Sequence, residues 1–307
     1  MELPDELKIN KKEVVNYTIK WVKDYFKPLK TRKAIVGLSG GSDSSFTAYI
    51  CRMALGKNNV FGVVMPSDSN PKEDENDAYA VAKAIGIKAK TISISSIIKA
   101  IEKENPELKK EKNRIARANI KARLRMLLLY KEANESNAIV AGTDDRSEHA
   151  LGYYTKYGDG GVDINVPEHL YKTQLRQILL WLGKDKNMGI LAKIAEKTPS
   201  PQLWKGQTAE NELGLLYEEI DKVLYSLNEK KIQKPEKIEE STGIKKEKII
   251  KIINMIERNA HKNMLPPPLP VYFSKEFHLP HNTCFFRSRL LPFFQVLLLC
   301  SFLTVGF

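Results

Sequence analysis

The clearest chemical pattern in the chain lies at residues 39–44, Ser-Gly-Gly-Ser-Asp-Ser. An apolar run at residues 33–38 precedes it, and a helical pattern at residues 46–55 follows it. Glycines let the backbone approach a phosphate closely, and a helix N-terminus offers free N–H groups with partial positive charge. Asp43 would repel phosphate unless a cation lies between them, so this carboxylate predicts bound Mg²⁺. A plain Gly/Ser turn with an Asp or Ser helix cap is the alternative.

A second group of polar residues begins where another apolar run, residues 138–142, ends. It holds the carboxylates of Asp144, Asp145 and Glu148, and a Gly- and Tyr-rich stretch follows at residues 152–163. Carboxylates at the end of a strand could complete a Mg²⁺ site opposite the first loop, or bind an amine. A solvated acidic loop is the alternative interpretation.

Short apolar runs alternate with helical patterns through the first half of the chain. The predicted strands are residues 33–38, 60–65, 90–94 and 138–142, and the predicted helices are residues 14–26, 46–55, 78–85 and 114–133. This alternation predicts an α/β fold, a doubly wound parallel sheet of the Rossmann-like type with helices on both faces. Such sheets bind ligands beyond the carboxyl ends of their strands, where the two polar groups fall.

No strand is predicted after residue 170. Helices are expected near residues 170–182, 189–196, 216–227 and 248–257, wrapped around the sheet rather than forming a core of their own. The stretch at residues 198–214 holds two prolines and two glycines, which favours a mobile functional loop.

Composition narrows the class of protein and its surroundings. The chain has 307 residues and a formal charge of +12, with lysines spread through most predicted helices. A basic composition this even favours a solvated surface over a nucleic-acid interface. The three cysteines, at positions 51, 284 and 300, form no CxxC pair, which favours a reducing cytoplasm without disulfides or structural zinc. The charged N-terminus lacks the apolar region of a signal peptide.

The end of the chain differs from the rest. After three prolines at residues 266–268 the sequence becomes apolar and aromatic. We therefore expect one α/β domain at residues 1–268 and an atypical tail at residues 269–307. A disordered or packed, divergent or read-through terminus is favoured for this tail, and a membrane anchor formed by residues 290–307 is the alternative.

The loop at residues 39–44 resembles the pyrophosphate loop of the N-type ATP pyrophosphatases, which split ATP into AMP and pyrophosphate while they activate a carbonyl or carboxylate. Taken alone, it would also fit GMP, argininosuccinate and asparagine synthetases or tRNA-thiolating enzymes. The combination of motifs is similar to ammonia-dependent NAD synthetase from about residue 14 to residue 268. The further motifs are Gly142-Thr143-Asp144, Ser147-Glu148, the run at residues 152–161, Asn119-Ile120-Lys121-Ala122-Arg123, Tyr171-Lys172, Pro199-Ser200, residues 203–208, Glu212-Leu213-Gly214 and residues 258–262.

This resemblance implies an enzyme that adenylates deamido-NAD with ATP and then amidates it with ammonia. It implies the following roles: ATP binding by Ser39, Gly40, Gly41, Ser42, Asp43, Ser44, Arg123, Thr143, Lys172 and Ser200; deamido-NAD binding by Asn119, Arg123, Lys156, Asp159, His261 and Lys262; catalysis by Asp159 and Lys172; and Mg²⁺ binding by Asp43 and Glu148. It also implies a cytoplasmic homodimer. Free ammonia, or ammonia from a separate partner, is expected because the chain has no room for an amidase domain.

Two of these residues have a plain alternative. Arg123 lies in a basic helix, where a solvated or ion-paired role is the alternative, and His261 could be a surface histidine. Three other functions also remain open: a tRNA-modifying ATP pyrophosphatase, a nucleotide-binding regulatory module without turnover, and a membrane-tethered protein. The first usually has a reactive Cys pair or an RNA-binding appendage, and the second needs no further Mg²⁺ carboxylate.

Overall fold

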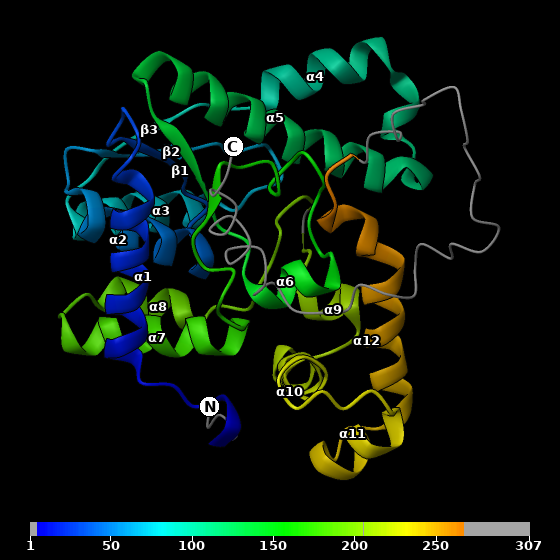
Figure 1. Ribbon diagram of the computed structural model, residues 1–307. Helices are drawn as coiled ribbons and strands as arrows, with labels where there is room; N and C mark the ends of the chain where they lie inside the picture. Colours follow the sequence, from blue (N-terminus) through cyan, green and yellow to red (C-terminus); the bar gives the residue numbers. More distant parts are fainter. Residues whose placement is uncertain (1–4, 205, 267–307) are drawn as a thin grey trace, which may run out of the picture. The chain divides into compact units, whose positions relative to one another are not determined.

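A five-stranded, fully parallel sheet lies at the centre of the computed structural model, which describes residues 5–204 and 206–266 (Figure 1). The strand order is β3-β2-β1-β4-β5. The strands are β1 (Ala34–Gly37), β2 (Val60–Val64), β3 (Lys88–Thr91), β4 (Ile139–Gly142) and β5 (Ile164–Asn165). The prediction of an α/β, parallel, doubly wound sheet is confirmed, whereas the predictions for residues 269–307 lie outside the described residues.

The order of the strands places a binding crevice beside β1. Chain order runs outward from β1 in one direction through β2 and β3, and then restarts on the other side with β4 and β5. Residue 34 of β1 pairs with residue 60 of β2 and with residue 139 of β4, so the three strands end at the same level. In an open parallel sheet, a reversal of the strand order such as the one beside β1 leaves a crevice at the carboxyl ends of β1 and β4.

Helices cover both faces because side chains along a strand point alternately to one face and the other. Ala34 and Val36 of β1 pack into a cluster with α1, α2, α3, α7 and α8, whereas Ile35 packs on the opposite face with α4 and α5. The helices are α1 (Lys11–Phe26), α2 (Ser42–Leu55), α3 (Lys72–Ile85), α4 (Ser95–Glu104), α5 (Arg114–Ser136), α7 (Lys172–Asp185) and α8 (Gly189–Glu196).

The later helices form a hydrophobic cluster of their own. Its fully buried members include Leu151, Tyr217, Leu224 and Ile249. The helices are α6 (Arg146–Leu151), α9 (Ala209–Leu213), α10 (Tyr217–Asn228), α11 (Pro235–Thr242) and α12 (Lys246–Asn259). The expectation that all helices after residue 170 wrap the sheet is therefore wrong for α10 and α12. Their apolar stripes pack against each other instead of against the strands.

Other differences from the predicted elements have local causes. The sequence analysis did not predict α4 or α6. In α6 the residues are mostly polar, and in α4 the isoleucines are scattered, so neither segment shows a clear helical spacing of apolar residues. The sequence also did not predict β5, which is only two residues long. Short 3₁₀ turns complete the described structure at η1 (Asp5–Leu7), η2 (Pro106–Lys109), η3 (Glu111–Asn113) and η4 (Ala260–Asn263).

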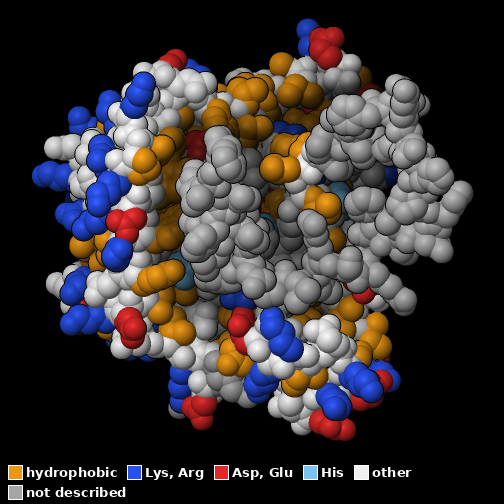
Figure 2. Space-filling model, viewed as in Figure 1, with side chains coloured by type: hydrophobic (Ala, Val, Ile, Leu, Met, Phe, Trp, Pro, Cys, Tyr) orange, Lys and Arg blue, Asp and Glu red, His pale blue; other side chains and the backbone are white. Residues whose placement is uncertain are grey.

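The surface of the described residues bears on two further expectations. On the face shown in Figure 2, Lys and Arg side chains are scattered among acidic and apolar ones rather than gathered into one patch. None of the helices within residues 5–204 and 206–266 combines the length and the apolar character that crossing a membrane requires.

Candidate active site

A cavity lies at the carboxyl ends of β1, β2 and β4, in the crevice that the strand order opens. It brings together residues that are more than 150 positions apart in the sequence. The residues with a predicted role that line it are Ser39, Asp43, Ser44, Thr143, Glu148, Asp159, Lys172 and Ser200. The topology therefore joins the phosphate loop and the acidic cluster in one site.

The loop between β1 and α2 is a tight glycine turn. Gly40 has φ +78°, and a Cβ atom there would lie 2.3 Å from the carbonyl oxygen of Asp74. Gly41 is the N-cap of α2, and no side chain caps this helix. The alternative of a turn capped by Asp or Ser is therefore wrong. The N-terminal N–H groups of α2 remain available to an anion, as phosphate binding requires.

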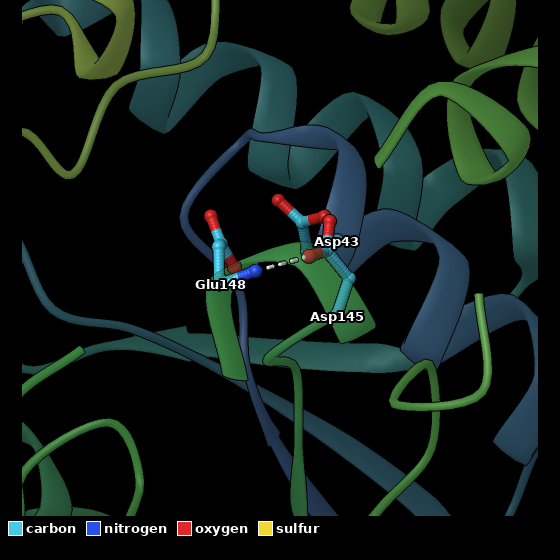
Figure 3. Close-up of side chains that lie close together, drawn as sticks. All are labelled: Asp43, Asp145 and Glu148. Carbon is cyan, nitrogen blue, oxygen red and sulfur yellow. Dashed lines mark hydrogen bonds between the residues drawn. The ribbon is translucent and has the colours of Figure 1, made fainter. Parts of the chain in front are cut away.

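Three carboxylates converge on the ammonium group of Lys172. Lys172 Nζ lies 2.8 Å from Asp43 Oδ1, 2.9 Å from Asp145 Oδ2 and 2.8 Å from Glu148 Oε1. Figure 3 shows the three acidic side chains gathered in one place, although Asp43 belongs to α2 and the other two to the start of α6. Lys172 itself is fully buried, and its ammonium group also lies 5.3 Å from the ring centroid of Tyr217.

The charges in this cluster depend on one another. Burial acts to lower the pKa of Lys172, but Asp145, Asp43 and Glu148 outweigh burial and hold the pKa well above its usual value. Burial raises the pKa of both Asp145 and Glu148, and the nearby ammonium of Lys172 opposes that rise. A positive charge among these carboxylates is therefore required to keep them ionised.

The same three carboxylates suit a hard divalent cation. One oxygen from each of Asp43, Asp145 and Glu148 lies within 4.8 Å of the others. Asp145 Oδ2 is buried without a hydrogen bond, although it lies at ion-pair distance from Lys172. Carboxylate oxygens are the ligands that Mg²⁺ prefers. The donor set therefore fits the predicted metal, and it adds Asp145 to the two ligands inferred from the sequence.

A buried carboxylate of α10 holds this arrangement in place. Asp221 accepts hydrogen bonds from Ser147 Oγ at 2.5 Å and from the Thr173 backbone N–H and hydroxyl at 2.9 and 2.7 Å. Ser147 Oγ in turn accepts from the backbone N–H of Lys172 at 2.9 Å. Asp145 caps α6 by accepting from the backbone N–H of Glu148 at 2.9 Å. The N-termini of α6 and α7 are thereby locked side by side.

The residues predicted to bind the dinucleotide gather around the loop at residues 152–161. Arg123 is exposed and donates to the Lys156 carbonyl at 3.4 Å, while Lys156 Nζ donates to the carbonyls of His261 and Met264 at 2.7 and 2.8 Å. Lys262 Nζ donates to the carbonyl of Gly152 at 2.6 Å. These contacts attach the end of α12 to the loop.

Asp159 connects this loop to the cavity. Its Oδ1 accepts from the Thr155 backbone N–H at 2.9 Å, and Thr155 Oγ1 donates to Asn119 Oδ1 at 2.8 Å. Although the side chain is exposed to the cavity, desolvation by the surrounding protein raises the pKa of Asp159. The backbone N–H of Thr155 and the charges of Lys262 and Arg125 oppose that rise.

The arginine that lines the cavity is a different one from Arg123, for which the sequence predicts nucleotide binding. Arg125, not Arg123, lines the cavity, where it donates to the Met65 carbonyl at 3.2 Å and to Asn70 Oδ1 at 3.1 Å. Burial lowers its pKa to about 10. Both arginines lie on α5, and two positions on a helix differ by about 200° around its axis, so only packing decides which one faces inward.

Ser200 lies in the stretch predicted to be mobile. Its hydroxyl donates to the Gln207 carbonyl at 2.5 Å, and Gln207 Nε2 donates to Glu212 Oε2 at 2.8 Å. Glu212 Oε2 also accepts from the hydroxyl of Tyr153, which lines the cavity, at 2.6 Å. Side chains of α9 and of the Gly/Tyr-rich loop thus support this serine.

The chain is similar to known proteins over most of its length. The family model for NAD synthase matches residues 14–266. The chain belongs to the NAD synthase family. An NH₃-dependent NAD⁺ synthetase of Sulfurisphaera tokodaii is 42% identical over 257 residues, which cover 84% of this chain and 88% of that protein. The corresponding protein of Methanocaldococcus jannaschii is 41% identical over 256 residues, 83% of this chain and 95% of that protein.

Solved structures agree with this assignment. The NMN synthetase of Francisella tularensis has a TM-score of 0.73 and 30% identity, and the match covers 86% of this chain and all of that one. The NH₃-dependent NAD synthetase of Campylobacter jejuni has a TM-score of 0.68 and 26% identity over the same shares. The predictions of an ATP-using ligase of NAD biosynthesis, and of an ammonia-dependent NAD synthetase, are confirmed.

Proposed function

We propose that the chain amidates deamido-NAD with ammonia at the expense of ATP, through a nicotinyl adenylate, and releases AMP and pyrophosphate. The main support for this proposal is that the loop at residues 39–44 and the acidic residues that follow β4 line one cavity. Both lie at the crevice beside β1, and Asp159, in the loop at residues 152–161, lines the same cavity.

The first half-reaction needs positive charge on the ATP phosphates. The carboxylate of deamido-NAD attacks the α-phosphorus, the bond to the β-phosphate oxygen breaks, and pyrophosphate leaves. The N–H groups at the start of α2 and the ammonium of Lys172 would stabilise the charge on the departing phosphates. Asp43, Asp145 and Glu148 would hold Mg²⁺, which when bound neutralises phosphate charge.

The second half-reaction turns the adenylate into an amide. Ammonia attacks the acyl carbon, the new C–N bond forms and the bond to the AMP oxygen breaks. Asp159 would accept the proton that ammonium must lose, because its carboxylate faces the cavity and its pKa is raised. Asn119, Arg123, Lys156, His261 and Lys262 surround the loop that carries Asp159, and they would seat the dinucleotide there.

We further infer a cytoplasmic homodimer that needs no nucleic acid. Tyr17, Trp21 and Tyr25 form an exposed aromatic stripe on α1, with exposures of 62, 41 and 36%. Such a stripe at helical spacing is typical of a surface that a partner covers. Trp21→Glu should shift the molar mass in light scattering from a dimer to a monomer. A dimer of unchanged mass would place the interface elsewhere.

Pyrophosphate release with ATP and Mg²⁺ tests the function, with and without deamido-NAD and ammonium. Release should need the dinucleotide, and NAD should form only when ammonium is added. The mononucleotide should be offered in parallel, because the name of the Francisella protein points to an NMN product. Release that ignores both nucleotides but responds to tRNA would remove the proposed function.

A further inference from the structure

Lys121 is a buried lysine of α5 whose ammonium binds two loops rather than a carboxylate. The residue is 5% exposed. Its Nζ donates to Ser69 Oγ at 2.9 Å and to the Leu203 carbonyl at 2.6 Å. Among the residues that the structure describes, no carboxylate lies at ion-pair distance from this ammonium. One side chain therefore joins two segments that are far apart in the sequence.

Both of these segments line the cavity. They are the β2 loop, defined here as residues 66–71, and the 199–204 segment. The β2 loop contributes Pro66 and Asn70 to the cavity wall, and the other segment contributes residues 199–203. A second contact joins the same two segments, because Asn70 Nδ2 donates to Gln202 Oε1 at 3.0 Å. Lys121 itself does not line the cavity, so it acts on the site through the segments that it holds.

The spacing of residues on α5 explains why its cations meet these two segments. Arg114, Lys121 and Arg125 lie seven and four positions apart, which places them on one face of a helix. The guanidinium of Arg114 lies 4.7 Å from the ring centroid of Trp204. Arg125 donates to Asn70 Oδ1 at 3.1 Å. This face of α5 thus contacts the β2 loop and the 199–204 segment with all three cations.

The position of Lys121 is unfavourable for its charge. Desolvation has the largest effect and lowers the pKa of Lys121 to about 8, and the positive charges of Arg117 and Arg125 act in the same direction. The negative charges of Glu102 and Asp68 oppose this change only in part. A buried charge without a carboxylate partner lowers the stability of the fold, which points to a role in function.

We propose that Lys121 is a positioning residue, which holds the 199–204 segment against the β2 loop and thereby keeps water from the acyl adenylate. This inference rests on the proposed function, because the adenylate is the intermediate of that reaction. With the segment held, ammonia attacks the acyl carbon, the C–O bond to AMP breaks and the amide forms. With the segment released, water attacks the same carbon and the same bond breaks, which returns the carboxylate of deamido-NAD, AMP and protons. Lys121 therefore determines the share of adenylate that becomes amide.

Lys121→Met tests the proposal, because methionine has a similar volume but donates neither hydrogen bond. A hydrogen bond from a charged donor changes an equilibrium about ten- to a hundredfold, so the released form of the segment should become more populated by that factor. NAD and pyrophosphate are measured in one reaction at saturating ATP and deamido-NAD. We expect one NAD per pyrophosphate for the wild type in excess ammonium.

The ratio of NAD to pyrophosphate should be at least about twofold lower for Lys121→Met, and it should rise as more ammonium is added to compete with water. General damage to the fold would lower both products together and leave the ratio unchanged. A ratio equal to that of the wild type at every ammonium concentration would therefore overturn the proposal, whatever the overall rate. A wild type that forms no NAD at all would instead remove the proposed function.

Lys131→Met is the matched control, since it makes the same substitution on the same helix. The ammonium of Lys131 pairs with Glu132 and Glu135 at 3.1 and 2.8 Å, and its side chain is 49% exposed. This variant should keep the wild-type ratio of NAD to pyrophosphate. If both variants lower the ratio equally, the effect belongs to α5 in general and the proposal fails.

Trp204 reports on the 199–204 segment without turnover. The chain has two other tryptophans, Trp21 and Trp181, and replacing both with phenylalanine in the full chain leaves Trp204 as the only tryptophan signal. Adding Lys121→Met should increase the quenching of this fluorescence by acrylamide, because the released segment exposes the indole. Unchanged quenching would overturn the proposal even if turnover is lost.

Gln202→Asn keeps the proposal testable if Lys121→Met does not fold. It withdraws the amide that contacts Asn70, and asparagine readily adopts the left-handed backbone of Gln202, whose φ is +54°. This variant should also lower the ratio of NAD to pyrophosphate. An unchanged ratio would show that holding the segment does not protect the adenylate, and the proposal would be wrong.

Discussion

Replacing Lys172 with methionine tests the charge balance of the site. Methionine keeps an unbranched apolar chain but removes the ammonium that three carboxylates contact at 2.8 to 2.9 Å. Breaking a buried ion pair from one side costs about 3–5 kcal/mol, because the remaining charge stays buried and uncompensated. Since Lys172 is fully buried, we expect a loss in the free energy of unfolding in that range when no divalent ion is present.

Magnesium should return part of that loss. Without Lys172, the three carboxylates are left as an oxygen-only site of the kind that Mg²⁺ binds. A ligand at a hundred times its dissociation constant stabilises the folded state by about 2.7 kcal/mol. Urea unfolding followed by circular dichroism, in EDTA and in Mg²⁺, should therefore show a larger magnesium effect for Lys172→Met than for the wild type. Pyrophosphate release should be lost in both conditions.

Lys193→Met is the control for this experiment. Lys193 also contacts two carboxylates, Glu73 and Asp77, both at 2.9 Å, but its side chain is 51% exposed. Because solvent screens this exposed ammonium, its loss should lower the free energy of unfolding far less than the loss of Lys172, and magnesium should not reverse that cost. If Lys172→Met is as stable as this control in EDTA, the ammonium does not hold the cluster together and the reasoning fails.

Three further predictions concern the same cavity. Gly40→Ala should abolish adenylate formation, seen as loss of pyrophosphate release, because the new Cβ would meet the Asp74 carbonyl oxygen at 2.3 Å. Asp221→Asn tests a pH dependence: burial raises the pKa of Asp221 from 3.8 to about 6, so the wild type loses stability as pH rises through that window. The difference in the free energy of urea unfolding between the wild type and the variant should therefore shrink as pH rises from 3.8 to about 6. Lys262→Met removes a charge that favours ionised Asp159, so the acid limb of the ammonium-dependent rate should move to higher pH. An unmoved limb would exclude Asp159 as the proton acceptor.

Much of the site was predictable because it follows from local rules. Glycines and serines after an apolar run predict a phosphate loop, and the same reasoning places Asp43 beside a cation. Strands of a parallel sheet end at one edge, so Glu148, which follows the fourth predicted strand, was expected near that loop. The alternation of apolar runs with helical patterns was clear enough to predict the α/β fold class from the sequence.

Side-chain direction was harder to predict from the sequence. Lys172 was expected at the phosphates, and the structure aims its ammonium at three carboxylates in the same cavity. Asp221 gave no signal, because a single carboxylate in an amphipathic helix is usually solvated. Its burial follows from the packing of α10 against α6 and α7, which no local pattern encodes.

The sequence by itself determined the parallel α/β class, the phosphate loop and the family, since each depends on residues close together in the chain. The tertiary structure alone decided which of two arginines faces the cavity and which carboxylate joins Asp43 and Glu148. Those choices depend on how helices rotate against the sheet and on which charges meet across more than 100 residues. The direction and the partners of these side chains depend on packing and electrostatics over the whole domain, so no local sequence pattern predicts them.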